Sequence, residues 1–216
     1  MTAICMLNAL WFRPDGGAER YAEYGAAVGP ILDDVGAKLL FPPFPLEQAL
    51  EGGFDPDLVV FVRYPSWEAF DGMWRTQAYQ EIAHLRTEAI SKAVLTRCAI
   101  DPDDATPVEQ LGSGIVVLNA LTFVDGGAAI YDEYLRQAEP LVRARGGQFL
   151  SPRMLPQAAL GEEFLPDLVF LGQYPSIEAV QDMVGSTEYQ QIAPTRSRSL
   201  KSAVTTVLRS GAGFRP

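Results

Sequence analysis

The sequence predicts an α+β protein in which two βαββαβ repeats within one chain pack their antiparallel sheets face to face. Two observations carry this prediction. The second half of the 216-residue chain repeats the first at a spacing of about 110 residues, and the expected strands are apolar at nearly every position. Because 48% of its residues are hydrophobic, a chain of this length can bury a substantial core.

The repeat is visible in matching segments of the two halves. RYPSWEAF at 63–70 returns as QYPSIEAV at 173–180, and LNAL occurs twice. By count, roughly two residues in five agree between positions 15–94 and their partners, which exceeds what shared composition produces. We therefore expect a first repeat over 1–100, an acidic linker with Pro and Gly over 101–113, and a second repeat with a short tail over 114–216.

Each copy is expected to begin with a strand and a helix. The strand covers residues 3–12, and the turn after it places Asp15 where its side-chain oxygen can cap the next helix. Apolar residues at helical spacing predict that helix over 21–35. Pro30 predicts a kink or a restart, and Gly36 ends the helix. The second copy offers the same elements at 115–123 and beyond.

Strands and a second helix are expected to complete each copy. Residues 38–41 predict a short strand, 42–56 a Pro-rich loop, and 58–64 a third strand rich in β-branched and aromatic side chains. Final strands over 94–100 and 204–208 close the two sheets.

The repeated YPSxEA phrase is expected to join the third strand to the second helix. Pro65 cannot continue the strand ladder, Ser66 can accept a hydrogen bond from the helix N-terminus, and Glu68 places negative charge there. A nucleophilic role for Ser66 or Ser176 would need a neighbouring base, which the sequence does not supply.

The strands are too apolar for a sheet that faces water on one side. Segments such as LVVFV and ICMLNALWF lack the alternation of such a sheet, so both of its faces must be covered. The helices of each half can cover one face, and the sheet of the other half is the remaining large apolar surface. We therefore expect a pseudo-dimer within one chain, with the helices outside and further oligomerisation left open.

Charge and composition exclude several classes of partner. A net charge of -10 argues against a nucleic-acid or anionic-membrane surface, and no apolar run reaches membrane-spanning length. The apolar first dozen residues lack the basic segment of a secretory signal. Cys5 and Cys98 are isolated thiols without a CxxC motif, which predicts neither a metal site nor a disulfide scaffold. We expect a cytoplasmic protein whose partner is a small molecule.

Several of these features together resemble a known family. The order of elements, the YPSxEA phrase, EYQ at 188–190 with AYQ at 78–80, and the later Arg86 and Arg196 resemble the bacterial domain of unknown function (DUF) 1330 family. The resemblance covers nearly the whole chain outside the linker and the tail. It implies the ferredoxin-like, dimeric α+β barrel superfamily, with two halves fused where most relatives use two chains. Segment 42–56 departs from the shorter Gly-rich hairpin expected there, so ligand contacts of that region do not transfer.

The resemblance also implies a cleft between each sheet and its helices. Asn8 and Asn119 lie in apolar strands, and each buried amide either bonds to backbone or water or faces a ligand. Arg86 and Arg196 either complement the negative end of a helix or hold a carboxylate or enolate. The tyrosines of the first helix of each half are expected to be core residues with satisfied hydroxyls: Tyr21, Tyr24, Tyr131 and Tyr134.

One set of residues resembles the haem-degrading branch of the superfamily. That branch has an Asn on the first strand and a Trp and a His on the second helix. Asn8, Trp74 and His84 of this chain resemble that set. In the alignment, Trp74 and His84 each fall one residue late, which rotates them by about 100° around the helix. The second half has Val184 and Pro194 instead. The alternative is that His84, the only histidine, is simply exposed near a helix end.

Three functions therefore stay open. The first is a cofactor-free monooxygenase or isomerase that acts on a hydrophobic or anionic metabolite, as the resemblance implies. The second is a non-catalytic ligand-binding or interaction module, and the third is a haem-binding protein. No metal or nucleotide is expected, and haem is the one cofactor alternative. The fold alone supports none of these over the others.

Overall fold

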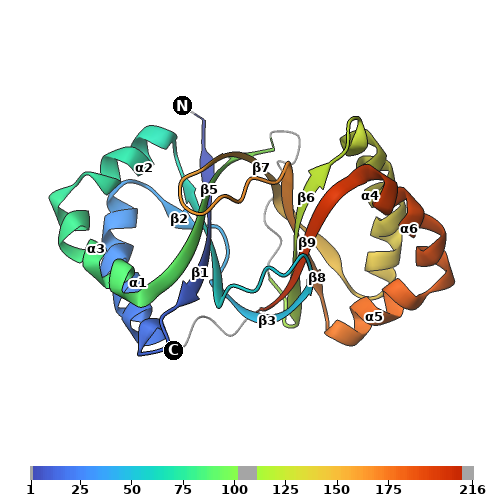
Figure 1. Cartoon of the computed structure of the whole chain (residues 1–216), viewed down its shortest axis with the longest axis horizontal. Helices are drawn as coiled ribbons and strands as arrows, with labels where there is room; N and C mark the ends of the chain where they lie inside the picture. Colours follow the sequence, from blue (N-terminus) through green and yellow to red (C-terminus); the bar gives the residue numbers. More distant parts are fainter. Residues whose placement is uncertain (1, 102–110, 211–216) are drawn as a thin grey trace.

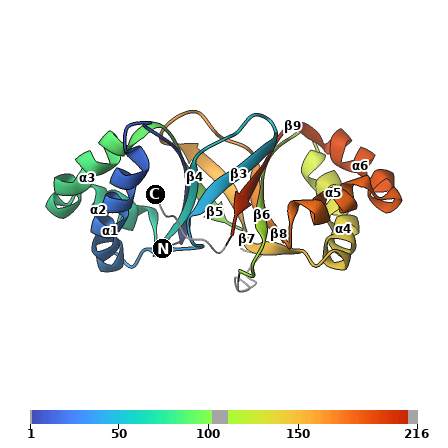
Figure 2. The ribbon, with the colours of Figure 1, turned by 90° about the horizontal axis from the view of Figure 1, so that it is seen from below.

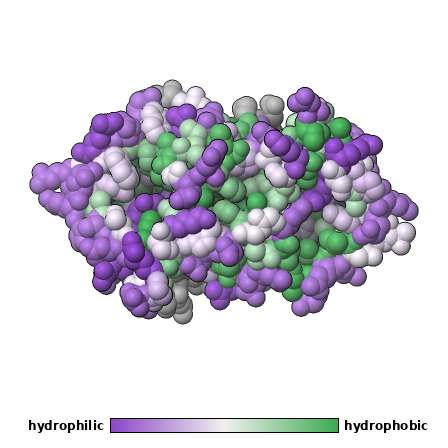
Figure 3. Space-filling model, in the orientation of Figure 1, coloured by the Kyte–Doolittle hydropathy of each residue, from purple (hydrophilic) through white to green (hydrophobic). Residues whose placement is uncertain are grey.

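The computed structural model describes residues 2–101 and 111–210 as an α+β fold with a central barrel of antiparallel strands (Figure 1). The helices of the first half cover one side of the barrel, and those of the second half cover the opposite side (Figure 2). On the face shown in Figure 3, hydrophilic residues dominate the two helical ends, and hydrophobic residues are visible between them. Most of the predicted linker and tail lies outside the described residues.

The elements follow the same order in both halves, except that the single strand β7 of the second half stands where the first half has two strands, β2 and β3. The first half contains β1 (Ile4–Phe12), α1 (Gly17–Asp34), β2 (Lys38–Leu39), β3 (Phe44–Glu51), β4 (Leu58–Tyr64), α2 (Trp67–Trp74), α3 (Gln77–Ala89) and β5 (Ile90–Ile100). The second half contains β6 (Ile115–Phe123), α4 (Gly127–Ala144), β7 (Gln148–Ala159), β8 (Leu168–Tyr174), α5 (Ile177–Gly185), α6 (Thr187–Ser199) and β9 (Leu200–Arg209).

Hydrogen bonds between the halves close the barrel. Neighbouring strands follow the order β1-β5-β7-β8-β6-β9-β3-β4, and β4 returns to pair with β1. The two strands that join the halves are β3, which pairs with β9, and β7, which pairs with β5. The two sheets that the sequence predicted to face each other are therefore connected at both edges into one barrel.

The predicted loop over 42–56 is wrong, because most of this segment is strand β3. Its first residues pair with β4, and from Leu46 to Glu51 it pairs with β9 of the other half. Proline-rich sequence lowers the local strand signal, and the partner that satisfies the backbone of β3 lies at the far end of the chain. Local pattern alone therefore hides this strand.

Both faces of the strands are buried, as the sequence predicted. The barrel interior is one cluster that includes Leu7 and Phe61 from the first half and Leu118 and Leu171 from the second. Alternate residues, such as Met6, face the helices. The halves thus share one hydrophobic interior and keep separate cores beneath their own helices.

The YPSxEA phrase caps a helix in both halves, which confirms its predicted role. Ser66 Oγ accepts a hydrogen bond from the backbone N–H of Ala69 at 3.3 Å, and Ser176 accepts one from Ala179 at 3.4 Å. Hydrogen bonding to Ser66 also holds the pKa of Glu68 below its usual range. A negative charge at this position suits the positive end of α2.

Two local predictions need correction. The single second helix is two helices, because Thr76 Oγ1 accepts from the N–H of Tyr79 at 3.2 Å and starts α3 anew. Asp15 does not cap α1, whose N-cap is Gly16 in the left-handed region with no side-chain cap. Of the two alternatives predicted at Pro30, a kink or a restart, the restart does not occur, because α1 continues through Pro30 and ends at Asp34, before Gly36.

The two cysteines are not isolated in space. Cys5 of β1 lies directly opposite Cys98 of β5, and both thiols are free and buried in the barrel interior. Burial raises the pKa of both thiols, that of Cys98 to about 12. They therefore stay protonated and unreactive at neutral pH.

None of the helices within residues 2–101 and 111–210 is long and apolar enough to cross a membrane.

Candidate functional site

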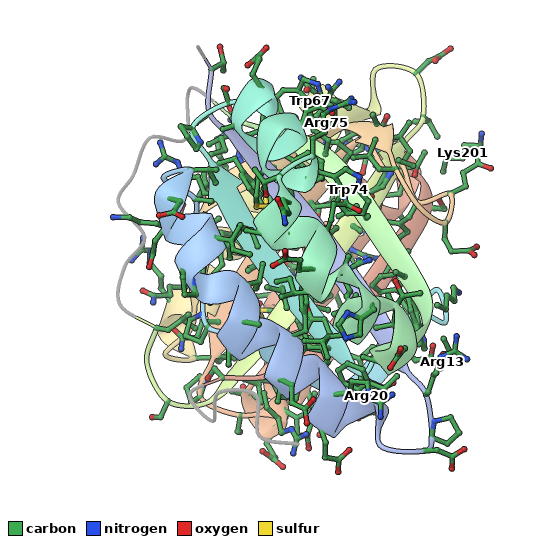
Figure 4. All side chains as sticks on the ribbon, turned by 90° about the vertical axis from the view of Figure 1, so that its left-hand side faces the viewer. Arg13, Arg20, Trp67, Trp74, Arg75 and Lys201 are labelled. Atoms are coloured by element: carbon green, nitrogen blue, oxygen red, sulfur yellow. The ribbon has the colours of Figure 1, made fainter. Side chains whose placement is uncertain are left out.

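Each half contains a cleft between its sheet and its helices. The first cleft, with a volume of about 320 Å³, lies between α1, α2 and α3 and strands β1, β4 and β5. The second cleft occupies the matching place in the second half and has a volume of about 400 Å³. Figure 4 shows the helices of the first half lying over the sheet, with Trp74 where α2 meets α3 and Arg20 near the start of α1.

The first cleft is apolar apart from a few polar groups. Its walls are mainly aliphatic side chains from the strands and from α1, such as Met6, Val60 and Val28. The polar groups include Asn8, Tyr21, Tyr24, Tyr79 and Arg86. An apolar cavity with a few convergent polar groups is typical of small-molecule sites.

The two asparagines lie in equivalent positions in the two clefts. Asn8 lines the first cleft and donates a hydrogen bond from Nδ2 to the carbonyl oxygen of Met6 at 3.3 Å. Asn119 lines the second cleft and donates to Val117 at 3.3 Å. Each amide is thus partly satisfied by the backbone of its own strand and also borders the cleft.

Tyrosine hydroxyls form the polar wall of each cleft. The hydroxyls of Tyr24 and Tyr79 lie 3.4 Å apart in the first cleft, and those of Tyr134 and Tyr189 lie 3.3 Å apart in the second. Burial raises the pKa of Tyr21 to about 12, against the opposing charge of Arg86. Burial raises the pKa of Tyr24 as well. The hydroxyls of Tyr21 and Tyr24 are therefore protonated at neutral pH and can donate hydrogen bonds.

Sequence interpretation assigned the tyrosines of α1 and α4 to the core and overlooked four others. Tyr64 and Tyr79 line the first cleft, and Tyr174 and Tyr189 line the second. All four belong to repeated phrases, YPS and YQ, so the repeat itself carried a signal. The repeat could not show that these tyrosines share a cleft, because Tyr64 lies in strand β4 and Tyr79 in helix α3, and only folding brings the two together.

The repeated arginines reach both clefts from the helix that precedes the last strand of each half. Arg86 and Arg196 lie in the last turns of α3 and α6, where their charge complements the helix end, and both line a cleft. Arg196 Nη2 lies 2.7 Å from Glu51 Oε2. Among the described residues, no carboxylate pairs with Arg86.

His84 and Trp74 lie in different environments from the cleft residues. Trp74 stands at the rim of the first cleft with 42% of its surface exposed, whereas His84 is exposed and does not line the cleft. His84 lies two positions before Arg86, about 200° around the helix, so it points away when Arg86 points in. Neither cleft has a histidine among its described lining residues, so neither offers an imidazole ligand for haem iron.

Comparisons with known proteins identify a family and a fold. The model of the family described as domain of unknown function (DUF1330) matches residues 17–96 and 119–209. A protein of unknown function from Rhodopseudomonas palustris is 34% identical over 44% of this chain and 80% of its own, with a TM-score of 0.42. No curated protein matches the chain.

Two further solved structures resemble nearly the whole chain. An anthrone oxidase-like protein has a TM-score of 0.60 at 12% identity, over 97% of this chain and 91% of its own. A mutant chlorite dismutase from Candidatus Nitrospira defluvii has a TM-score of 0.57 at 10% identity, over 95% and 91%. At these identities the similarity shows a shared fold.

Proposed function

The chain belongs to the DUF1330 family, and from its clefts we propose that it binds a small hydrophobic molecule whose carboxylate or enolate is held by Arg86. The fold supports a small-molecule protein, because the solved structures that resemble nearly the whole chain include an anthrone oxidase-like protein and a chlorite dismutase. We also propose that each half is a ferredoxin-like repeat that arose by internal duplication, and that the two form a pseudo-dimer.

The observation that carries the proposal is a half-buried guanidinium in an apolar cleft, without a carboxylate partner among the described residues. A planar guanidinium can hold a carboxylate or an enolate with two parallel hydrogen bonds. Apolar surroundings strengthen this attraction relative to water. The protonated hydroxyls of Tyr21 and Tyr24 add donors and cannot repel an anion at neutral pH.

The size of the first cleft restricts the ligand. A volume of about 320 Å³ lies at the lower end of the range for small-molecule sites. Its aliphatic walls favour a flat or compact apolar body, and Trp74 at the rim provides an optical signal for binding. A bicyclic aromatic acid such as 2-naphthoate is therefore a suitable probe.

The first test removes the guanidinium. We expect Arg86→Ala to weaken 2-naphthoate binding at least about tenfold, because a charged hydrogen-bonded pair is lost. Isothermal titration calorimetry measures this, and circular dichroism verifies the fold of the variant. The matched control is Arg20→Ala, which breaks an exposed pair with Glu88 outside the cleft and should leave affinity unchanged.

A second probe tests whether charge is what Arg86 recognises. The neutral analogue 2-naphthamide should bind weakly to the native protein and equally weakly to Arg86→Ala. Equal affinity of the native protein for acid and amide would overturn the proposed role of Arg86. Loss of binding in Arg20→Ala as well would indicate a general electrostatic effect rather than a site.

The pH dependence of binding tests the role of the Tyr21 hydroxyl. Between about pH 6 and pH 9 a guanidinium stays charged and a carboxylate probe stays ionised. Burial raises the pKa of Tyr21 to about 12, so its hydroxyl stays protonated over this range. Affinity should therefore be flat and fall only in strong alkali, when the phenolate of Tyr21 begins to repel the anion. A fall in affinity between about pH 6 and pH 9 would show that another titrating group holds the anion.

We further propose a catalytic form of this function, cofactor-free oxidation or isomerisation. Both reactions can pass through an enolate, and a fixed guanidinium with phenol donors stabilises such a negative charge. Oxygen uptake with anthrone as the probe tests this, and the rate should fall in Arg86→Ala. Binding without uptake would favour the alternative, a non-catalytic ligand-binding module.

A further inference from the structure

The two clefts are built differently, because residues of both halves line the second. Among the residues that the structure describes, those that line the first cleft all come from the first half. The second cleft is lined by its own half and by Leu50 and Glu51, which end strand β3. This contribution follows from the pairing of β3 with β9 across the barrel.

Glu51 lies at the anion-binding end of the second cleft. Its Oε2 accepts a hydrogen bond from Arg196 Nη2 at 2.7 Å and one from Thr205 Oγ1 at 3.2 Å. Only 19% of the Arg196 side chain is exposed. Burial opposes the charge of Arg196, but the hydrogen bond and charge of Glu51 raise its pKa above the ordinary value. The guanidinium of the second cleft is thus already neutralised by a carboxylate.

Within residues 2–101 and 111–210, no carboxylate pairs with Arg86 in the first cleft as Glu51 pairs with Arg196 in the second. At the repeat spacing of 110 residues, Gly161 matches Glu51 and Leu95 matches Thr205. A Cβ atom at Gly161 would lie 2.9 Å from the carbonyl oxygen of Ala93, so a side chain fits poorly there.

The acidic residue that lines the first cleft lies at its other end. Asp33 is twelve positions after Tyr21 on α1, about 18 Å along the helix. Arg86 lies near Tyr21, whose pKa its charge lowers against burial. The charge of Arg86 therefore remains open to a ligand while that of Arg196 is occupied.

We propose that Glu51 is an internal carboxylate that occupies the anion site of the second cleft, so that the native chain takes one anionic ligand, in the first cleft. The ligand class rests on the function proposed above. The pairing of Glu51 with Arg196 also indicates which chemical group such a cleft arginine binds. That group is a carboxylate with one oxygen directed at the guanidinium. The duplicated fold thus contains one open site and one that is filled by the chain itself.

Binding stoichiometry tests this inference. In calorimetric titrations with 2-naphthoate we expect one site per chain for the native protein and two for Glu51→Ala. Adding Arg196→Ala to Glu51→Ala should return the number to one. The matched control is Glu47→Ala, which removes an ion pair between β3 and β9, with Arg209 at 3.7 Å, and should leave one site.

Variants that retain Glu51 keep the test independent of the folding of Glu51→Ala. Arg196→Ala alone should still bind one probe molecule, and Arg86→Ala alone should bind none. Two sites in the native protein, or one site in a folded Glu51→Ala, would overturn the inference. If Arg86→Ala leaves native binding intact, the function proposed for the first cleft fails. A second site that appears in Glu51→Ala and needs Arg196 would still support the role of Glu51.

Discussion

Replacing Phe61 with alanine is expected to lower the free energy of unfolding by about 3–5 kcal/mol, as for large aromatic residues removed from protein cores. Phe61 is fully buried in the barrel interior. Its ring lies 6.0 Å from that of Phe41 and 6.5 Å from that of Phe44, between centroids. Because Phe44 begins the strand that crosses to the other half, the cavity weakens the junction of the halves. Denaturant unfolding followed by circular dichroism measures the change.

Leu39→Ala is the matched control for this substitution. Leu39 is an apolar residue of β2 with 48% of its surface exposed, so its removal should change stability by less than about 1 kcal/mol. If Phe61→Ala cost no more than Leu39→Ala, the barrel would not have a single packed interior shared by the halves.

The second large effect on stability is expected at Gly127, where the start of α4 packs against the backbone at the end of α6. A Cβ atom at Gly127, the first residue of α4, would overlap the carbonyl oxygen of Ser199 at the end of α6. Gly17 meets the carbonyl of Ala89 in the same way in the first half. Since backbone cannot move aside as a side chain can, Gly127→Ala should destabilise the protein by about 1–3 kcal/mol or more.

At Gly72, where a side chain would have open space, substitution by alanine is expected to raise stability. Gly72 lies inside α2, and a Cβ atom there would meet nothing within 4 Å. Gly72→Ala should therefore stabilise the protein by about 0.5–1 kcal/mol, since alanine is the better helix former. Melting temperatures measured by calorimetry should shift in opposite directions for the two variants. A shift in the same direction would contradict the close approach at Gly127.

Much of the candidate site was predictable from repeated residues. Asn8 and Arg86 were selected because a polar group in an apolar strand and a recurring cation stand out in the sequence, and both line the first cleft. His84 was predicted as a ligand-binding residue because an imidazole can bind haem iron. Its position on α3, about 200° around the helix from Arg86, directs it away from the first cleft. Glu51 could not be selected, because its segment was predicted to be a loop and its partner, Arg196, belongs to the other half.

Periodicity and the repeat sufficed for most of the element order, for the caps in the YPSxEA phrase and for strands buried on both faces, since each depends on residues close together in sequence. Barrel closure, the crossing of β3 to β9 and the difference between the clefts arise from hydrogen bonds and ion pairs between distant segments. Such contacts form only when the chain brings these segments together, so two related local sequences enter unequal surroundings. For that reason the repeat predicted a cleft in each half, and folding paired the arginine of the second cleft with Glu51, whereas Arg86 has no carboxylate partner among the described residues.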